Sequence, residues 1–482
     1  MGLNRGMPVA ADVVTHLLRR TEFVALPERV AELTAMPSLD AAVDDILNVD
    51  PNPPSIDPDP VPPQYVPSEH AERIRKVTNT WIDFMAHRSP RRLQERMALF
   101  WHGHFVSDDA KAGYTHTIAE QIDLYRRAGL GNLRELAIDM ATTVAMLRYL
   151  DNNQNFVDAP NQNFGRELLE LFLLGVGNYT EADVEACTAA WTGHGENGHH
   201  TNGQYKWNNR HDSTPRAFLG RTTCAHEDPR QHGPDTIRIV LGNPATIGGT
   251  VPVGPNQGRP TRDVAAEFIS RKLWTYFAGT EIPKDVLAHL RTAAVTNDFA
   301  LKPWLKALLT HPAFYSTDVR RGLLRAPVDY VVAMLAASGL PAETGNPFWL
   351  GDGMGQRLLF PPNVSGWGHN GYYVNASAFS QRAAAAEHVA HYVLAEYWDG
   401  PGMHLRRGRL SRAEVWSTGQ DPERRRALVR RMLDLMGITV GAQTMAALDE
   451  FAVNAKLDPD RNVDELYDLV KLILVSPEMN VA

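Results

Sequence analysis

The stretch that decides the fold is residues 152–194, NNQNFVDAPNQNFGRELLELFLLGVGNYTEADVEACTAAWTGH. It places four polar residues at i, i+3, i+4 and i+7, which makes one polar stripe along a helix: Asn163, Arg166, Glu167 and Glu170. Leucine and phenylalanine fill most of the other positions, so we expect a largely buried helix that begins near Gln162. A carboxylate in such a place needs a partner, because an unpaired charge in a core is very costly.

The residues after the stripe indicate where the helix stops. Gly175 and Gly177 are expected to end it, because glycine accepts the left-handed backbone that follows many helices. Thr180 and Asp183 have the spacing of a capping box, so a second helix is expected to begin there and to run to Trp191.

The same apolar spacing predicts helices along most of the chain. They are expected at 13–20, 27–35, 39–47, 69–87, 90–101, 114–128, 132–147, 262–277, 283–294, 302–310, 327–338 and 376–397, and again within 412–477. A strand pattern is limited to Thr236–Leu241. The predicted fold is therefore mainly α, a multi-helix globular array with long irregular loops and at most a small β element.

Three segments are expected. Residues 1–50 form an N-terminal helical segment, and 51–68 form a strap or linker because its eight prolines cannot lie inside a helix. Residues 69–482 form the main helical domain. Within it, 193–262 is an irregular excursion rich in Gly, Asn and His, and excursions of this length are usually functional or disordered. Six of the chain's 18 histidines lie in it: His194, His199, His200, His211, His226 and His232.

Composition excludes several classes of protein. Apolar residues make up 44% and charged residues 22% of the chain, as in ordinary globular proteins. A net charge of −8 argues against a nucleic-acid partner, and no apolar run is long enough for a membrane helix. Two cysteines exclude a disulfide scaffold. We see no signal peptide and expect a cytoplasmic protein, whose oligomeric state the sequence leaves open.

The polar stripe has two interpretations. Arg166 can pair with Glu170 and Asn163 with Glu167, which would make a self-satisfied polar face. Alternatively, Glu167 and Glu170 point their carboxylates the same way, as helix-bundle metal sites require. The candidate catalytic residues are Glu167, Glu170, Arg166 and, from the excursion, Asp212.

Histidines add candidate metal ligands. His102 and His104 lie in the aromatic run FWHGHF, either as satisfied core residues or as ligands. His211 precedes Asp212 and is a candidate ligand or general base. The predicted metal set is His104, His211, Glu170 and His102. Imidazole and carboxylate ligands together suit iron, manganese or zinc.

Amide and aromatic side chains near the irregular stretches are candidates for substrate binding: Asn163, Trp191, Trp367 and Asn375. Asn375 is also expected to cap the helix that follows it. No nucleotide cofactor is expected, because the glycine-rich GDGMGQ at 351–356 follows no strand and lacks the G-K-S/T of a phosphate loop.

The chain resembles a bacterial family catalogued as a domain of unknown function, DUF1800. The resemblance covers nearly the whole chain, through HLLRRTEF, ERMALFWHGHFVS, the stretch above, HDSTPRAFLG, EFISRKLWTYF, RAPVDYVVAML, LLFPPNVSGWG, VNASAFSQR and LILVSPEM. It implies a mainly helical fold but no settled activity. Positions that match the family pattern are His104, Asn163, Arg166, Glu167, Glu170, Asp183, His211, Asp212, Asn363, Gly366, Trp367 and Asn375.

Three residues depart from that pattern. The family usually has Glu at Gln162, His at Phe172 and Trp at His194. Loss of the histidine at Phe172 weakens a metal site that would use it; either His194 compensates for it or the site is specialised. Family members often carry export signals, and none is seen in this sequence, so we expect a divergent intracellular member of the family.

Three functions compete. The first is a metal-dependent enzyme, an oxidoreductase rather than a hydrolase, that acts on a small molecule beneath the excursion. The second is a non-catalytic glycan- or peptide-binding or assembly protein that uses exposed aromatic residues: Trp191, Trp207, Tyr205, Trp367, Tyr372 and Tyr373. The third is a metal-free acid/base enzyme, which requires a shifted pKa at Glu167 or Glu170.

Overall fold

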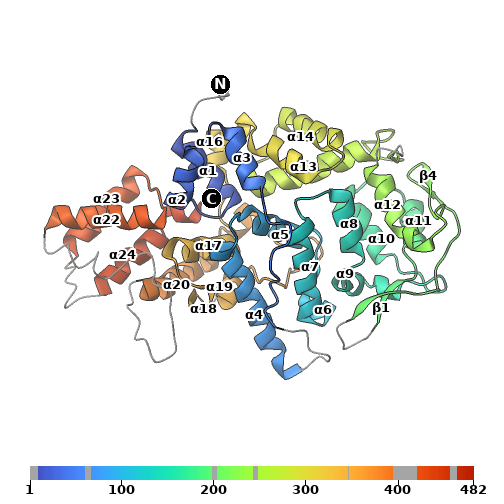
Figure 1. Ribbon diagram of the computed structural model, residues 1–482, viewed down its shortest axis with the longest axis horizontal. Helices are drawn as coiled ribbons and strands as arrows, with labels where there is room; N and C mark the ends of the chain where they lie inside the picture. Colours follow the sequence, from blue (N-terminus) through green and yellow to red (C-terminus); the bar gives the residue numbers. More distant parts are fainter. Residues whose placement is uncertain are drawn as a thin grey trace.

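The computed structural model describes residues 9–59, 67–197, 203–242, 248–345, 347–393, 421–455 and 464–482. Helices dominate these residues, and the strands among them form two small two-stranded sheets (Figure 1). The prediction of a mainly α fold is confirmed. None of the described helices is both long and apolar enough to cross a membrane.

The N-terminal helices pack onto later parts of the chain. These are α1 (Ala11–Thr21), α2 (Pro27–Thr34) and α3 (Leu39–Leu47). Helix α1 contacts α13 (Thr261–Ala278), and α3 contacts α15 (Leu301–Leu309). Residues 51–59 of the proline-rich segment are non-helical and are fixed by hydrogen bonds from Ser55 and Ile56 to Asp123.

The next helices along the chain are η1 (Pro67–Glu69), α4 (His70–Asp83), the π-helix η2 (Phe84–Arg88), α5 (Leu93–His104), α6 (Asp109–Ala112), α7 (Thr115–Ala128), α8 (Leu133–Ala141), α9 (Val144–Tyr149) and η3 (Asn152–Gln154). Helices α5 and α7 lie near the centre of Figure 1. The helix expected at 132–147 is two helices, because Thr143 caps α9. The buried charge in these helices is paired: Glu95 contacts Arg126 at 2.8 Å.

The striped helix changes its hydrogen-bond pattern partway along. It begins as α10 (Asn163–Glu167) and continues as the π-helix η4 (Leu168–Leu173). Gly175 and Gly177 follow with φ of 82° and 80°, so both end signals are confirmed. Thr180 and Asp183 form the expected capping box of α11 (Glu181–Ala190).

The excursion contains both small sheets. Strand β1 (His194–Asn197) pairs with β2 (Gln204–Trp207), and β3 (Ala217–Phe218) pairs with β4 (Arg221–Thr222), in both cases antiparallel. A short turn, η5 (Pro229–Gln231), then leads into α12 (His232–Leu241). His199 and His200 lie outside the described residues.

The strand expected at Thr236–Leu241 is wrong, because this segment is the second half of α12. Its β-branched residues fit either structure, and a short apolar run does not separate a strand from a buried helix. Pro234 lies in the first turn, where a helix tolerates proline. Ile237, Val240 and Leu241 then share one fully buried face at helical spacing.

The remaining elements are α14 (Lys284–Thr296), η6 (Pro312–Tyr315), α16 (Thr317–Gly322), α17 (Pro327–Ser338), α18 (Ala342–Gly345), α19 (Pro347–Gly353), η7 (Asn370–Tyr373), α20 (Ala376–Val393), α22 (Pro422–Met436), α23 (Ala442–Asn454), α24 (Asp464–Leu474) and α25 (Pro477–Asn480). The helices expected between 262 and 338 are confirmed. The expected end of the 376–397 helix lies outside the described residues.

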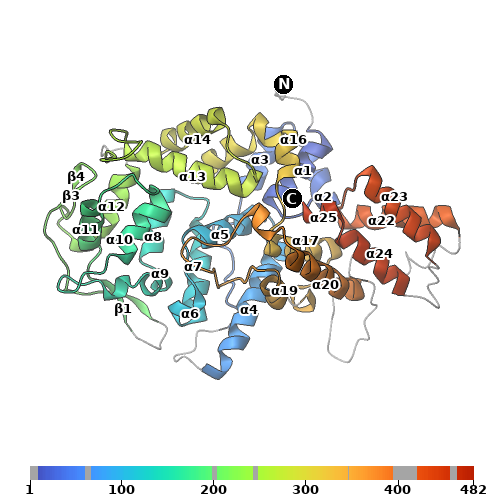
Figure 2. The same cartoon turned by 180° about the vertical axis from the view of Figure 1, so that it is seen from behind.

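The molecule is elongated, and different segments of the chain form its two ends. Figure 2 shows α22, α23 and α24 at one end and α10, α11, α12 and β1 at the other. The C-terminus lies near α1, between the two ends (Figures 1 and 2). The excursion and the striped helix therefore share one end of the molecule.

Candidate functional site

Three residues of the excursion converge on one point. His211 follows β2, Cys224 follows β4, and His232 begins α12. One possible ligand atom from each residue lies within 4.8 Å of the other two. Among the described residues, these three side chains are close enough together to bind one metal ion. Two imidazoles and a thiol are a ligand set that transition metals accept. We call His211, Cys224 and His232 the HCH cluster.

Backbone carbonyls fix how both imidazoles face. Nδ1 of His211 lies 2.7 Å from the Thr192 carbonyl oxygen, and Nε2 of His232 lies 2.8 Å from the His226 carbonyl oxygen. A carbonyl only accepts hydrogen bonds, so these two nitrogens carry the hydrogens. Nε2 of His211 and Nδ1 of His232 therefore present lone pairs to each other, at 2.8 Å.

A proton is a poor bridge between these two nitrogens. Burial lowers the pKa of His211, and the neighbouring His232 lowers it further, although the Thr192 carbonyl acts in the opposite direction. Burial also raises the pKa of the Cys224 thiol, so the free thiol is protonated at neutral pH. A bound metal ion would relieve the facing lone pairs and would deprotonate the thiol.

His194 stands beside the cluster and is also buried. Its Nδ1 lies 3.1 Å from the Tyr205 hydroxyl, while its Nε2 has no hydrogen-bond partner in the described part of the chain. Burial, followed by the nearby His211 and His232, lowers the pKa of His194 to about 3. Ring contacts run from His194 to Trp207 and from Trp207 to His211, each with centroids 5.1 Å apart.

Asp212 contacts residues of the surrounding loops and is not part of the HCH cluster. Its backbone N–H donates to Thr192 Oγ1, and its carboxylate pairs with Arg216 at 2.8 Å. Burial would raise the pKa of Asp212, but hydrogen bonds from Thr214 and Arg216 outweigh this and lower it. In this arrangement the carboxylate anchors the start of the segment that carries Cys224.

The polar residues of the stripe do not form the predicted pairs with one another. Arg166 pairs with Glu181 at 2.7 Å instead of Glu170, and Glu170 accepts the Tyr179 hydroxyl at 2.7 Å. Asn163 donates to Asp151 at 3.3 Å instead of Glu167. Because the helix widens into η4 after Glu167, Glu170 no longer lies one α-turn beyond Arg166.

The striped face is partly exposed, which corrects the expectation of a largely buried helix on that side. Glu167 is half-buried, and burial together with the charge of Glu170 raises its pKa. Glu167 is thus a carboxylate of the stripe whose pKa lies above its ordinary value.

The predicted ligands on α5 are not in the HCH cluster, and neither is Glu170. His104 has both ring nitrogens engaged, with Nε2 at 3.0 Å from the Phe172 carbonyl oxygen and Nδ1 at 3.1 Å from Lys272 Nζ. His102 is fully buried, has no hydrogen-bond partner among the described residues, and packs edge-on against Trp81 and Trp367. Burial lowers the pKa of His102 to about 3.

The predicted substrate-binding residues lie apart and mostly have structural contacts. Trp191 is fully buried and donates to Thr236, and Trp367 packs on Gly103. Asn375 caps α20 by accepting the Ala378 N–H at 2.8 Å, as expected. Asn163 is exposed.

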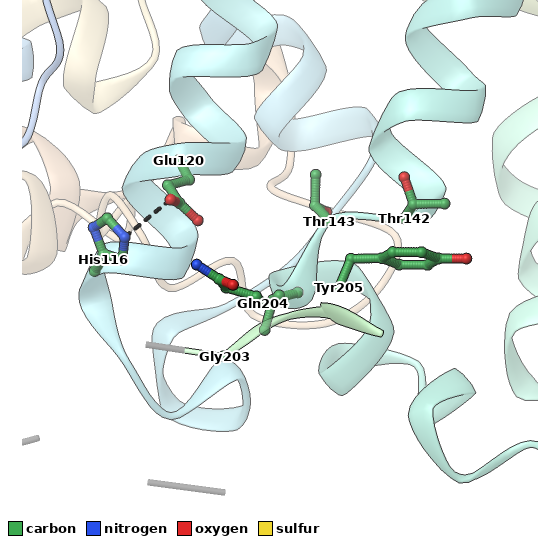
Figure 3. Close-up of a pocket in the computed structure, with 8 residues that line it drawn as sticks. His116, Glu120, Thr142, Thr143, Gly203, Gln204 and Tyr205 are labelled. Atoms are coloured by element: carbon green, nitrogen blue, oxygen red, sulfur yellow. Dashed lines mark ion pairs between the residues drawn. The ribbon is translucent and has the colours of Figure 1, made fainter. Parts of the chain in front are cut away.

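A pocket of about 460 Å³ opens beside the excursion (Figure 3). Segments far apart in the sequence form its wall: the start of α7, the α8–α9 junction and β2. The lining residues are His116, Glu120, Thr142, Thr143, Val144, Gly203, Gln204 and Tyr205. Tyr205 joins this wall to His194 through its hydroxyl.

His116 carries a positive charge in the pocket wall. It contacts Glu120 at 3.0 Å, the ion pair drawn in Figure 3, and Asp57 at 3.3 Å. Burial would lower the pKa of His116, but hydrogen bonds with Asp57 and Glu120 raise it to about 9. The pocket therefore offers hydroxyl, amide, carboxylate and imidazolium groups to a ligand.

Sequence reasoning identified His211 but missed Cys224 and His232 as its partners. The signal was weak, because the separations between the three residues follow no metal-site pattern. Cys224 was nonetheless the one cysteine of a histidine-rich stretch.

Comparison with known proteins identifies a family. The model of a family described as a protein of unknown function, DUF1800, matches residues 16–248 and 261–481. The HCH cluster, the striped helix and all the lining residues of the pocket lie within the first matched segment. No curated protein and no solved structure matches the chain.

Proposed function

The chain belongs to the DUF1800 family, and we propose that it is a metal-dependent oxidoreductase that holds its ion with the HCH cluster and acts on a small molecule. The observation that carries the proposal is the pair of lone pairs facing each other at 2.8 Å, on His211 Nε2 and His232 Nδ1. The carbonyls behind both rings are the kind of outer hydrogen bond that orients metal-bound histidines.

The ligand set supports zinc or copper over manganese. A thiolate is a soft ligand that copper and zinc accept, whereas manganese prefers carboxylate and water oxygens. Two histidines and one cysteine are also the ligands of trigonal copper sites that transfer electrons. This favours an oxidoreductase over a hydrolase and makes copper the expected ion.

The pocket beside Tyr205 is the proposed place for the substrate. Tyr205 lines it, bonds His194, and so begins the path of ring contacts that reaches His211 through Trp207. The polar lining suits a small molecule with hydroxyl or amide groups. The aromatic rings around the cluster would exclude water from the ion.

Metal analysis of the full-length protein tests the proposal. After exposure to Cu²⁺ or Zn²⁺ and gel filtration, we expect an equimolar amount of copper and a visible thiolate-to-copper absorption band. Cys224→Ser should abolish the band, and His232→Ala should remove most of the metal. His289→Gln is the matched control, since His289 is an exposed histidine outside the cluster. A wild-type protein without stoichiometric metal would contradict the proposal, and one that retains zinc alone would contradict the redox assignment.

Glu167 supports a second candidate, a metal-free acid/base enzyme. Burial and the neighbouring Glu170 raise its pKa, which is the property a general acid near neutral pH needs. If metal analysis finds no bound ion, this becomes the favoured function. The binding-protein alternative has less support, because Trp191, Trp367 and Tyr373 are buried.

A further inference from the structure

Lys272 of α13 is a partly buried amine with unusual partners. Its Nζ lies 3.1 Å from His104 Nδ1 and 2.9 Å from the Leu171 carbonyl oxygen, and 4.7 Å from the centre of the Phe268 ring. The contacts described for it include no carboxylate. Most surface lysines face water or an acidic side chain, so this amine is held for a different reason.

The π-helix η4 provides the acceptors. Its wide turn directs the N–H groups of Leu174 and Gly175 to the Leu169 carbonyl. The Leu171 and Phe172 carbonyls instead accept from the side chains of Lys272 and His104. Such single π-turns in helices are frequent at functional sites.

His104 is fixed as a hydrogen-bond acceptor for this amine. Its Nε2 lies 3.0 Å from the Phe172 carbonyl oxygen and therefore carries the hydrogen, which leaves Nδ1 as a lone pair. That lone pair is the atom that meets Lys272 Nζ. Burial, followed by the charge of Lys272, holds the pKa of His104 well below its usual value.

We propose that Lys272 is a nucleophilic amine that forms an imine with a small aldehyde or ketone, with His104 as its proton acceptor. The neutral amine nitrogen attacks the carbonyl carbon and forms a C–N bond. The carbonyl oxygen becomes an alkoxide, and His104 Nδ1 relays one proton from the nitrogen to it, which gives the neutral carbinolamine. His104 then relays the second N–H proton to the hydroxyl, which leaves as water while the nitrogen lone pair forms the C=N bond, so atoms and charge balance.

The electrostatics around Lys272 agree with this role. Burial lowers the pKa of Lys272 to about 8, so a substantial fraction is neutral near physiological pH. The titratable groups that interact with it are His104 and His369; burial lowers the pKa of both, and the charge of Lys272 lowers it further. A lysine is activated in this way when it is desolvated without an acidic partner.

This site is independent of the proposed metal centre. Lys272 and His104 lie on α13 and α5, and neither belongs to the HCH cluster. Failure of the metal proposal would leave the amine unchanged, and the reverse also holds.

Reductive trapping tests the proposal on the full-length protein. Acetone and sodium cyanoborohydride convert each imine to a stable isopropyl-lysine, and peptide mass spectrometry gives the rate at each lysine. Near neutral pH we expect Lys272 to react at least about tenfold faster than the exposed Lys284 and Lys302, since each unit of pKa changes the neutral fraction tenfold. The wild-type labelling rate at Lys272 should be half-maximal near pH 8, which requires no variant.

Two variants separate chemistry from packing. His104→Gln should slow labelling at Lys272 and leave Lys284 and Lys302 unchanged. Lys272→Arg keeps a cation for the Leu171 carbonyl but should remove the fast adduct. If Lys272 reacts more slowly than the exposed lysines, or if its rate shows no dependence on pH below about 9 where ordinary lysines stay charged, the proposal is overturned and Lys272 only caps η4.

Discussion

Backbone carbonyl oxygens decide the tautomers of three histidines in this protein. His211, His232 and His104 each direct one N–H to a backbone carbonyl, and this decides which nitrogen is free. The sequence marks these histidines as candidates but does not contain their tautomers, because each carbonyl comes from a distant or irregular segment. That is why His104 was expected to be a metal ligand, whereas the structure commits both its nitrogens to protein partners.

His116 supplies a prediction at this scale. Its folded pKa of about 9 lies above the value of about 6.5 expected in the unfolded chain. The charged His116 imidazole therefore stabilises the folded state fully below about pH 6.5, and this stabilisation is lost as pH rises through about 9. We expect His116→Gln to lower the free energy of unfolding by about 1–2 kcal/mol at about pH 6 and by almost nothing at about pH 10.

Urea unfolding at both pH values measures this difference. His289→Gln is the control, because His289 is an exposed histidine on α14. An equal loss for His116→Gln at both pH values would show that the two carboxylates do not stabilise a charged imidazole.

At the scale of elements, periodicity predicted the positions of the long helices well, but it predicted short segments and side-chain pairs less well. Long apolar repeats such as α13 and α17 were placed correctly because a buried face repeats over several turns. The strand expected at Thr236–Leu241 was wrong because a short run rich in β-branched and apolar residues does not distinguish a strand from a helix. The Arg166–Glu170 pair was wrong because η4 follows from packing and from side-chain bonds to its carbonyls, which no local pattern reveals.

The capping box of α11 allows a comparison of two caps. Thr180→Ala removes one cap and is expected to cost about 1 kcal/mol. The Asp183 carboxylate accepts the Thr180 N–H and also the Leu219 N–H at 2.7 Å, just after β3. Asp183→Ala should therefore cost about 2–3 kcal/mol, since it leaves a second buried donor without a partner.

Denaturant unfolding of the two variants checks this order. Thr292→Ala in α14 is the control, because Thr292 is exposed and its hydroxyl bonds only its own helix. Equal losses for Thr180→Ala and Asp183→Ala would mean that the Leu219 contact contributes nothing.

At the scale of the molecule, distant segments meet in ways that sequence separation hides. His104 reaches Lys272, and the C-terminal residue Ala482 bonds the Leu323 carbonyl. The overall α class followed from composition and periodicity alone. These contacts depend on how the whole chain folds, so the sequence alone could not predict the lysine site or the pocket wall.

Removal of the proposed ion should have a local effect. The HCH cluster joins the β2–β3 loop to the segment after β4 and to the start of α12, at the end of the molecule that carries α11 and β1 (Figure 2). Chelation is expected to speed amide hydrogen exchange in β3, β4 and α12, and to leave α13 and α17 unchanged. Because a ligand that binds only the folded state stabilises it, Tm should fall by about 2–4 °C.

Hydrogen exchange with mass spectrometry before and after chelation is the measurement. Cys224→Ser should exchange like the chelated wild type and should not respond to chelator. Uniform protection in both states would show that the excursion needs no ion to hold its shape.

The wide turn at Leu168–Leu173 makes the length of this segment as important as its composition. Each residue of a helix turns the chain by about 100°, so deleting one residue to restore a regular helix would rotate everything before it by that amount. Arg166 would then leave Glu181, and the carbonyls that meet Lys272 and His104 would be drawn back into the helix. Related chains should therefore tolerate substitutions here more readily than insertions or deletions.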